Sequence, residues 1–468
     1  MINSIVMTLP MVKDSNVEER KSPNFQPTED ELNPQGALKK ALELALGKKT
    51  QASEFSYPIF KTKLRTITRR AVLWLGQTCN LRCYFCYFLD RIESKQHPEH
   101  EFMTIEKAKE ICDKLVSHYR NNAIDIQGGE PTIWKPILEL VAHCHKIGLE
   151  ATLITNALVL DDIEVCKRFK QAGVRDFLMS VHGIGEVHDQ VVVRKGAHVR
   201  QMNAIRNLRE IGIPFRFNCV LSKPVVNQLP EIAGLAVSTG ARAVNFLAFN
   251  PFEDQAQSGK RSSLNVARYS EIKPKLDEAL DILEKNNVEA NVRYFPFCMI
   301  SDRHWKSNYN FQQLSYDHHE WDYASWAWTG MQPQRMKEGP PTEPVPMFGQ
   351  KMFWPIRKTL IRIAHWPYVG KRMVKVFTTV GQILQGFRQK DRIYREMAKI
   401  HAHLHSGYAH TPECERCSLK EICDGFHGDY SSIFGTSEAN AIRFAQPIIN
   451  PIHFIANQEK IIEKEDES

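Results

Sequence analysis

From residue 71 to about residue 250, short apolar runs rich in β-branched residues alternate with amphipathic segments of 3.6-residue periodicity, and this alternation limits the possible folds more than any other property of the chain. It is typical of βα units, in which helices join parallel strands. Six strands are expected, at residues 71–76, 123–127, 150–155, 175–181, 214–221 and 242–248. The sequence therefore predicts an α/β fold with a partial (β/α)6 TIM-like barrel, whose chemistry lies at the carboxyl ends of the strands.

The rest of the chain follows other patterns, which suggest domain boundaries. Residues 1–68 are polar and are expected to form an N-terminal extension, and residues 69–287 are expected to form the partial barrel. Residues 288–435 contain four more cysteines and are expected to form a second domain, interrupted at 301–410 by a basic and aromatic insertion. Residues 436–468 are expected to form a C-terminal tail.

Composition excludes several classes of protein. The 468 residues are 43% hydrophobic and 25% charged, which excludes fibrous and wholly disordered chains. No apolar run approaches the roughly 18 residues that a membrane span needs, and no basic leader precedes the short apolar stretch at the N-terminus, so a cytoplasmic protein is expected. The 11 cysteines are an odd number in a chain without an export signal, which favours metal ligation, catalysis or core burial over disulfides.

Three of these cysteines follow the first expected strand. Cys79, Cys83 and Cys86 have C-x3-C-x2-C spacing on one loop. Three thiolates can bind three irons of a [4Fe–4S] cube and leave the fourth iron open, whereas a closed zinc site needs four ligands. On spacing alone, a zinc site or a cluster that only transfers electrons remains an alternative.

The next strands place polar residues at the same edge. The second strand ends in Gly128, Gly129 and Glu130, where the glycines would let backbone approach a ligand closely and the carboxylate could accept a hydrogen bond from an amine. The third strand ends at Asn156, and the fourth presents Ser180. Because parallel strands end at a common edge, these residues are expected to hold one small molecule.

This pattern resembles the radical S-adenosylmethionine (SAM) superfamily over residues 71 to about 250, on the three cysteines, Phe85, the GGEP motif and the strand order. The resemblance implies that SAM chelates the open iron, that one-electron reduction cleaves SAM to a 5′-deoxyadenosyl radical, and that the radical abstracts a substrate hydrogen. It also implies a flavodoxin- or ferredoxin-type electron donor.

The resemblance further implies a set of SAM contacts. Gly128, Gly129 and Glu130 would receive the amine of SAM, and Phe85 would pack near its adenine. The residues expected near the ribose and carboxylate are Asn156, Ser180 and Arg194. In the fifth strand Arg216 and Asn218 share one face and would point toward cofactor or substrate, although a structural ion pair explains Arg216 equally well.

A second group of cysteines lies beyond a helix at about 264–286 and a strand-like run at 291–297. It consists of Cys298, Cys414, Cys417 and Cys423. The closing segment resembles the cysteine-rich tails of the SPASM/twitch branch of the superfamily, which implies one auxiliary [4Fe–4S] cluster. A zinc site made by the same four thiolates remains an alternative.

The net charge of +7 is local, because residues 351–400 carry twelve Lys or Arg against Asp391 and Glu396. A solvated basic face, a lid over an anionic substrate and peripheral membrane contact all explain this segment. It lacks a recognition fold for nucleic acid. A small, anionic or lipid-linked substrate is favoured, because the 68 polar N-terminal residues look too short for the leader-binding module of peptide maturases.

The sequence thus predicts a radical SAM iron–sulfur enzyme that abstracts hydrogen from a small substrate, with redox help from one auxiliary cluster. A SPASM-type peptide maturase is the first alternative, and a non-catalytic metal-binding scaffold is the second. No catalytic base is identified, and His182, Asp429 and Tyr430 are candidates only.

Overall fold

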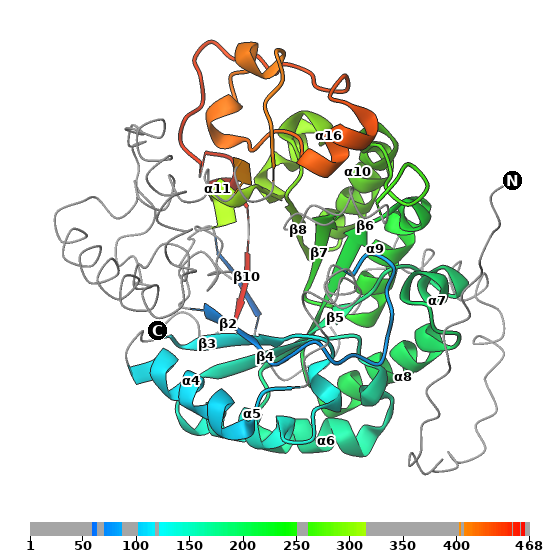
Figure 1. Ribbon diagram of the computed structural model, residues 1–468, viewed down its shortest axis with the longest axis vertical. Helices are drawn as coiled ribbons and strands as arrows, with labels where there is room; N and C mark the ends of the chain where they lie inside the picture. The colour runs from blue at the N-terminus through cyan, green and yellow to red at the C-terminus, as the bar shows by residue number, and fades with distance from the viewer. Residues whose placement is uncertain are drawn as a thin grey trace, which may run out of the picture.

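The computed structural model describes residues 59–62, 70–86, 102–117, 121–249, 261–314, 402–403, 407–451, 453–458 and 460–463 (Figure 1). Within these ranges the main element is a sheet of eight parallel strands that neighbour one another in chain order. The strands are β2 (Arg70–Trp74), β3 (Ala123–Gln127), β4 (Glu150–Thr155), β5 (Asp176–Ser180), β6 (Phe215–Leu221), β7 (Ala243–Ala248), β8 (Glu289–Arg293) and β9 (Asn308–Tyr309). The α/β prediction and the six expected strands are confirmed, and the sheet is an open partial barrel because β2 and β9 do not pair.

Two further strands extend the six that were expected. The strand-like run predicted at 291–297 begins and ends earlier, as β8, and residues 297–299 form the short 3-10 helix η4 (Phe297–Met299), which contains Cys298. The two-residue strand β9 was not predicted, since two residues are too few to show a periodicity. The sheet therefore continues across residue 287, where the sequence suggested a domain boundary.

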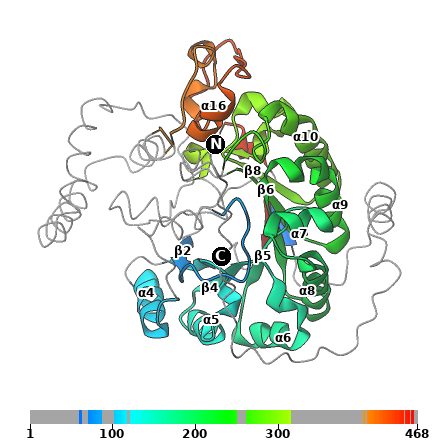
Figure 2. The ribbon, with the colours of Figure 1, turned by 45° about the vertical axis from the view of Figure 1, so that its right-hand side comes forward.

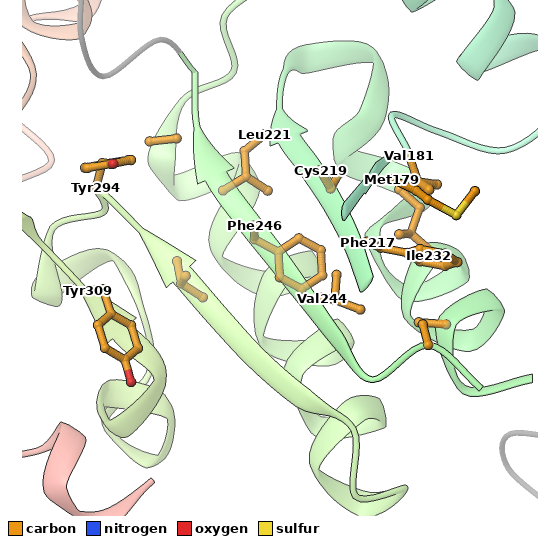
Figure 3. Packing of buried hydrophobic residues seen from close by; sticks show 14 of the residues in the cluster. Met179, Val181, Phe217, Cys219, Leu221, Ile232, Val244, Phe246, Tyr294 and Tyr309 are labelled. Carbon is orange, nitrogen blue, oxygen red and sulfur yellow. The ribbon is translucent and has the colours of Figure 1, made fainter. Parts of the chain in front are cut away.

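Helices cover the outer face of the curved sheet (Figure 2). They are α4 (Ile105–Ser117), α5 (Ile137–Lys146), α6 (Ile163–Ala172), α7 (Glu186–Val192), α8 (Ala197–Ile211), α9 (Leu229–Thr239) and α10 (Tyr269–Lys285). Alternation along β6 and β7 sends Phe217, Cys219, Leu221, Val244 and Phe246 into the core between sheet and helices (Figure 3). The residues between them face the inner side of the sheet, where the site is expected.

The cysteine-rich C-terminal part lies beside α10 and the short helix α11 (Phe311–Leu314) (Figure 1). It contains the 3-10 helices η7 (Cys414–Arg416) and η8 (Lys420–Ile422) and the helix α16 (Gly428–Phe434). The rings of Tyr269 in α10 and Tyr430 in α16 stack with centroids 3.8 Å apart. Buried Arg261 donates to Asp429 at 2.7 Å and to the carbonyl oxygen of Phe249 after β7 at 2.5 Å. These contacts fix the C-terminal part against the end of the barrel.

A second, two-stranded sheet joins distant parts of the chain. Strand β1 (Ile59–Thr62) pairs antiparallel with β10 (Lys460–Glu463), so the N-terminal extension and the C-terminal tail meet. The basic segment 351–400 and most of the predicted insertion at 301–410 lie outside the described residues. Among the helices that are described, none has the length and apolar character needed to cross a bilayer.

Candidate active site

The first cysteine loop, residues 79–86, lies beyond the end of β2 and is anchored by backbone hydrogen bonds. Arg82 and Tyr84 donate their N–H groups to the carbonyl oxygens of Val192 (3.4 Å) and Val191 (3.3 Å) at the end of α7. Within the loop, Cys86 N–H donates to the carbonyl of Cys83 at 2.9 Å. The loop is thus held by a helix more than a hundred residues later in the chain.

The two glycines after β3 let this loop begin in the right place. Gly129 and Glu130 donate N–H groups to the carbonyl oxygens of Gly76 (2.8 Å) and Thr78 (2.9 Å). A Cβ atom at Gly129 would lie 2.0 Å from the carbonyl oxygen of Thr78, and one at Gly128 would lie 2.6 Å from that of Gly76. From the sequence we expected the glycines to let backbone approach a ligand, and in this structure the chain that approaches them is the backbone of the cysteine loop.

Glu130 joins the ends of two strands. Its Oε1 accepts hydrogen bonds from Thr132 N (3.0 Å), Thr132 Oγ1 (2.6 Å) and Thr155 Oγ1 (2.6 Å), and its Oε2 accepts one from Asn156 N (2.7 Å). The side chain is 1% exposed. Burial raises the pKa of the carboxyl, and these hydrogen bonds oppose that increase. The threonines were missed from the sequence because hydroxyl partners of a carboxylate show no periodicity.

Asn156 and Arg194 both contact Asn80, between the first two cysteines. The Asn156 side-chain amide donates to Asn80 Oδ1 at 2.7 Å, and the Arg194 guanidinium donates to the Asn80 carbonyl oxygen at 3.0 Å. Asn156 Oδ1 accepts the N–H of Leu158 at 3.1 Å. Both predicted SAM ligands therefore lie at the cysteine loop, and both hold it in position. Asn80 was missed because one asparagine in a loop carries no pattern.

Phe85 packs in an aromatic cluster at the same edge. Its ring centroid lies 4.7 Å from that of His182 and 6.2 Å from that of Phe249, and Tyr84 stacks on Phe249 at 6.1 Å. His182 Nδ1 accepts the N–H of Val220 at 3.2 Å, and burial lowers the pKa of His182 to about 3, so the ring is neutral. The cluster gives the loop an apolar wall.

Ser180 and Asn218 are register partners on the inner face of the sheet, and the same level continues with Asn245 and Asn291 on β7 and β8. Gln201, fully buried in α8, donates to the carbonyl oxygen of Ser180 at 2.8 Å. Asn156 directly follows Thr155, the register partner of Met179, on β4. One row of hydroxyl and amide groups thus runs across five neighbouring strands, at the carboxyl ends of β4 and β5 and at the middle of β6, β7 and β8.

The amides at the far end of this row have fixed orientations. Asn291 Nδ2 donates to Glu289 Oε1 at 2.9 Å and to Asn245 Oδ1 at 3.1 Å. Gln458 Nε2 donates to the carbonyl oxygen of Ala290 at 2.7 Å and to Asn291 Oδ1 at 3.3 Å. An ionised carboxylate and a carbonyl oxygen can only accept hydrogen bonds. Glu289 and the carbonyl of Ala290 therefore each face an amide nitrogen, which fixes the orientation of the Asn291 and Gln458 side chains. The amide nitrogen of Asn245 is thereby directed away from β8.

Arg216 makes a buried ion pair. Its Nε lies 2.7 Å from Asp176 Oδ2, and both side chains are nearly inaccessible. The structural explanation that the sequence left open therefore applies in this structure. Of the three candidate bases, Asp429 is paired with Arg261, and Tyr430 accepts the N–H of Tyr269 at 3.0 Å and donates to Glu438.

The first three thiols fit a shared iron–sulfur group. Burial raises the pKa of Cys79 to about 12, and Glu130 and Cys86 add to the increase. Burial also raises the pKa of Cys83, with further increases from Cys86 and Cys79. The pKa values of Cys79 and Cys83 are thus both raised by neighbouring cysteines. Leu81 N–H also donates a hydrogen bond to Cys79 Sγ at 3.4 Å. A buried group of thiols needs positive charge to become thiolates, which iron supplies.

The second set of cysteines also comes together. Burial raises the pKa of Cys298 to about 11, and Cys414 and Cys417 add to it. Burial raises the pKa of Cys423, and Cys298 adds to that increase. Cys298 follows β8, while the other three lie over a hundred residues later in the chain. That all four bind one cluster stays a prediction. Thr411 Oγ1 also donates to Cys414 Sγ at 3.5 Å.

Neither set is arranged around a single ion. Within the part of the chain that the structure describes, no three His, Cys, Asp or Glu side chains converge as one bound metal ion requires. Each iron of a cube takes its own thiolate, so the ligands of a cluster stand farther apart than the four ligands of zinc. Both donor sets consist of thiols alone, which is the ligand type of iron–sulfur clusters.

A parallel α/β partial barrel with a three-cysteine loop after its first strand and a GGE turn after its second is the arrangement that the sequence led us to expect of an iron–sulfur protein. Comparison with known proteins agrees with this: residues 75–233 match the model of the Radical SAM superfamily. The chain therefore carries a radical SAM domain, which confirms the resemblance seen in the sequence. This superfamily uses a [4Fe–4S] cluster and SAM.

Curated relatives match about a third of the chain. Fe-coproporphyrin III synthase of Methanosarcina barkeri is 30% identical over 165 residues, 35% of this chain and 40% of the relative. PqqA peptide cyclase of Bradyrhizobium diazoefficiens is 28% identical over 174 residues, 36% of this chain and 43% of the relative. The chain thus spans less than half the length of these two relatives.

Solved structures show a more distant likeness. Streptococcus suis SuiB bound to S-adenosylmethionine is 16% identical, with a TM-score of 0.39, and the match covers 48% of this chain and 50% of that one.

Proposed function

We propose that this chain is a radical SAM enzyme in which Cys79, Cys83 and Cys86 hold a [4Fe–4S] cluster with one iron left for SAM. When bound, the cluster supplies one electron to SAM, and the resulting 5′-deoxyadenosyl radical abstracts a hydrogen atom from the substrate. The proposal rests on the two backbone hydrogen bonds that join the GGE turn to the start of the cysteine loop. Gly129 N–H donates to the carbonyl oxygen of Gly76, and Glu130 N–H donates to that of Thr78. These hydrogen bonds place three thiols at the carboxyl edge of the sheet.

The residues around the loop then divide by role. Ser180 and Asn218, on the inner face, are proposed to bind polar groups of SAM, and Phe85 to pack against its adenine. The backbone of residues 128–130 is proposed to receive the amine, because the oxygens of Glu130 already accept four hydrogen bonds. Asn156 and Arg194 are proposed to act through Asn80, as positioning residues for the loop.

Cys298, Cys414, Cys417 and Cys423 are proposed to hold one auxiliary [4Fe–4S] cluster, as in the SPASM/twitch branch. Four thiolates leave no iron open, so this site would transfer electrons rather than bind substrate. That favours a reaction in which the substrate is oxidised or forms a new bond after hydrogen abstraction. The Arg261–Asp429 pair joins α16, which follows the last three of these cysteines, to the end of the barrel.

The proposed substrate is a small anionic molecule, lipid-linked or free, and Fe-coproporphyrin III synthase among the relatives supports this class. A ribosomal peptide is the second candidate, which PqqA peptide cyclase and the sporulation killing factor maturation protein SkfB of Bacillus subtilis favour. A scaffold without catalysis is the remaining alternative.

Anaerobic reconstitution with iron and sulfide, followed by SAM and dithionite, tests the proposal. Formation of 5′-deoxyadenosine, measured by liquid chromatography and mass spectrometry, is expected from the wild type and not from Cys83→Ala. Equal amounts from both proteins would contradict it. Transfer of deuterium into 5′-deoxyadenosine from a labelled tetrapyrrole carboxylic acid, or from a labelled peptide, would distinguish the two substrate classes.

A further inference from the structure

A patch of basic side chains lies on the surface beside the first cysteine loop. Residues 79–86 and 190–199 are joined by the backbone hydrogen bonds of Arg82 and Tyr84 and by Arg194 to Asn80. These two segments contain three basic residues and no acidic residue. The basic residues, all exposed, are Arg82, Arg194 and Lys195. We call these three side chains, together with Val193, the basic face.

The turn that carries the basic face is next to two of the three thiols, Cys79 and Cys83. Val192 and Ala197, which flank the turn at residues 193–196, belong to a small buried apolar cluster with Leu81, and Cys79 and Cys83 pack against it. One layer of side chains therefore separates the thiols from the exposed turn. A protein bound to the turn would be close to the cluster proposed at Cys79, Cys83 and Cys86.

The turn is held rigidly in an unusual conformation. Val193 has φ +57°, a region that β-branched residues rarely adopt, and its side chain is 61% exposed. The Asp189 carboxylate accepts N–H groups from Gly196 (2.5 Å) and His198 (2.8 Å), and Arg194 N–H donates to the Asp189 carbonyl at 2.9 Å. The turn thus presents an apolar tip between cationic side chains, as the centre and rim of a small interface do.

We propose that the basic face is the docking surface for a small acidic protein that carries one electron. This rests on the proposed function, because cleavage of SAM requires that the carrier be oxidised by one electron and the cluster at Cys79, Cys83 and Cys86 be reduced by one. Opposite charge steers the carrier to this face and fixes its orientation. The apolar tip of Val193 supplies contact area without a competing charge.

Reduction by two different donors tests the proposal. Reconstituted full-length protein is supplied with SAM and either dithionite or a purified flavodoxin with its NADPH-dependent reductase, and the initial rate of 5′-deoxyadenosine formation is measured. Lys195→Glu reverses one charge on the face. Lys146→Glu makes the same change at the exposed end of α5 and serves as the control. Val193→Asp adds a negative charge at the tip with a residue that tolerates positive φ.

In about 50 mM salt, the flavodoxin-driven rate should fall at least about fivefold in Lys195→Glu and in Val193→Asp, with no change in Lys146→Glu. The dithionite-driven rate should be the same in all four proteins. Raising the salt to about 300 mM should slow the wild type toward the variants. Equal flavodoxin-driven rates in wild type and Lys195→Glu at low salt would overturn the proposal, as would a wild type that responds to dithionite and not to flavodoxin. Failure with dithionite would instead overturn the proposed function.

Discussion

The Glu130 carboxylate at the end of β3 accepts the backbone N–H of Asn156 at the end of β4, with 2.7 Å between Oε2 and the nitrogen. The same Asn156 donates its side-chain amide to Asn80 in the cysteine loop. A buried acid, a strand end and the metal-binding loop are thereby linked in one chain of hydrogen bonds. A substitution at the GGE turn or at Asn156 should therefore change the position of the cysteine loop. The first two predictions test this at Gly129 and Glu130.

Gly129→Ala should displace the cysteine loop, because a methyl group there would lie 2.0 Å from the carbonyl oxygen of Thr78, a backbone atom that cannot turn aside. We expect the reconstituted variant to lose about four irons per chain, the content of one cube. Iron and sulfide analysis measures this. Gly148→Ala is the control, since a methyl group at that position would have nothing within 4 Å; it should cost about 1 kcal/mol from its φ of +74° and keep its iron. Unchanged iron in Gly129→Ala would refute the role of the close approach.

Glu130→Gln should weaken the link between β3 and β4. An amide nitrogen would replace one carboxylate oxygen and face a donor, so at least one buried hydrogen bond is lost and one donor is left unpaired. The free energy of unfolding is expected to fall by about 2–3 kcal/mol. SAM cleavage should slow with it, because Asn156 positions the loop. Chemical denaturation and the dithionite assay report the two effects, and wild-type values in both would count against this role.

Arg216→Met should lower the free energy of unfolding by about 3–5 kcal/mol, because it leaves Asp176 buried without its cation. The double variant Arg216→Met/Asp176→Leu should recover most of that loss. Arg303→Met is the matched control, since its pair with Asp281 is half exposed and should be worth no more than about 1 kcal/mol. If the double variant were as unstable as the single one, the ion pair would not be the cause.

The stability of the protein should fall in acid through His182. Burial lowers its folded-state pKa to about 3, below the 6.5 of an exposed histidine, so the neutral ring stabilises the folded state above pH 6.5. As the pH falls from 6.5 toward 3, unfolding takes up one more proton, and the free energy of unfolding drops by about 1.4 kcal/mol for each pH unit. Denaturation at pH 7.5 and 5.5 should show a smaller drop in His182→Gln. An identical drop in both proteins would exclude this group as its source.

Cys423→Ala should separate the two clusters. The variant is expected to lose about four irons and keep dithionite-driven formation of 5′-deoxyadenosine, because Cys79, Cys83 and Cys86 are unchanged. Iron analysis and the cleavage assay are read on the same sample. A variant that keeps all its iron, or a wild type that binds one zinc ion which the variant loses, would favour the zinc alternative for the second set.

The sequence predicted those parts of the molecule in which a local pattern repeats. The strands at 123–127 and 150–155 begin and end as predicted, because their apolar runs are bounded by polar turns. The helix expected at about 264–286 begins at Tyr269, since Arg268 and Glu271 form its N-terminal cap. What the sequence did not reveal are contacts between residues far apart in the chain. Gln458 orients Asn291, and Asn80 joins Asn156 to Arg194, with no periodicity that could announce either.

The most direct test of the central claim is electron paramagnetic resonance of the Cys423→Ala variant, which should hold one cluster. The protein is reconstituted without oxygen and reduced with dithionite, and spectra are recorded before and after SAM is added. If Cys79, Cys83 and Cys86 leave one iron open to SAM, the g-values of the reduced cluster should shift on addition. Identical spectra with and without SAM, from a sample that contains about four irons per chain, would contradict the account.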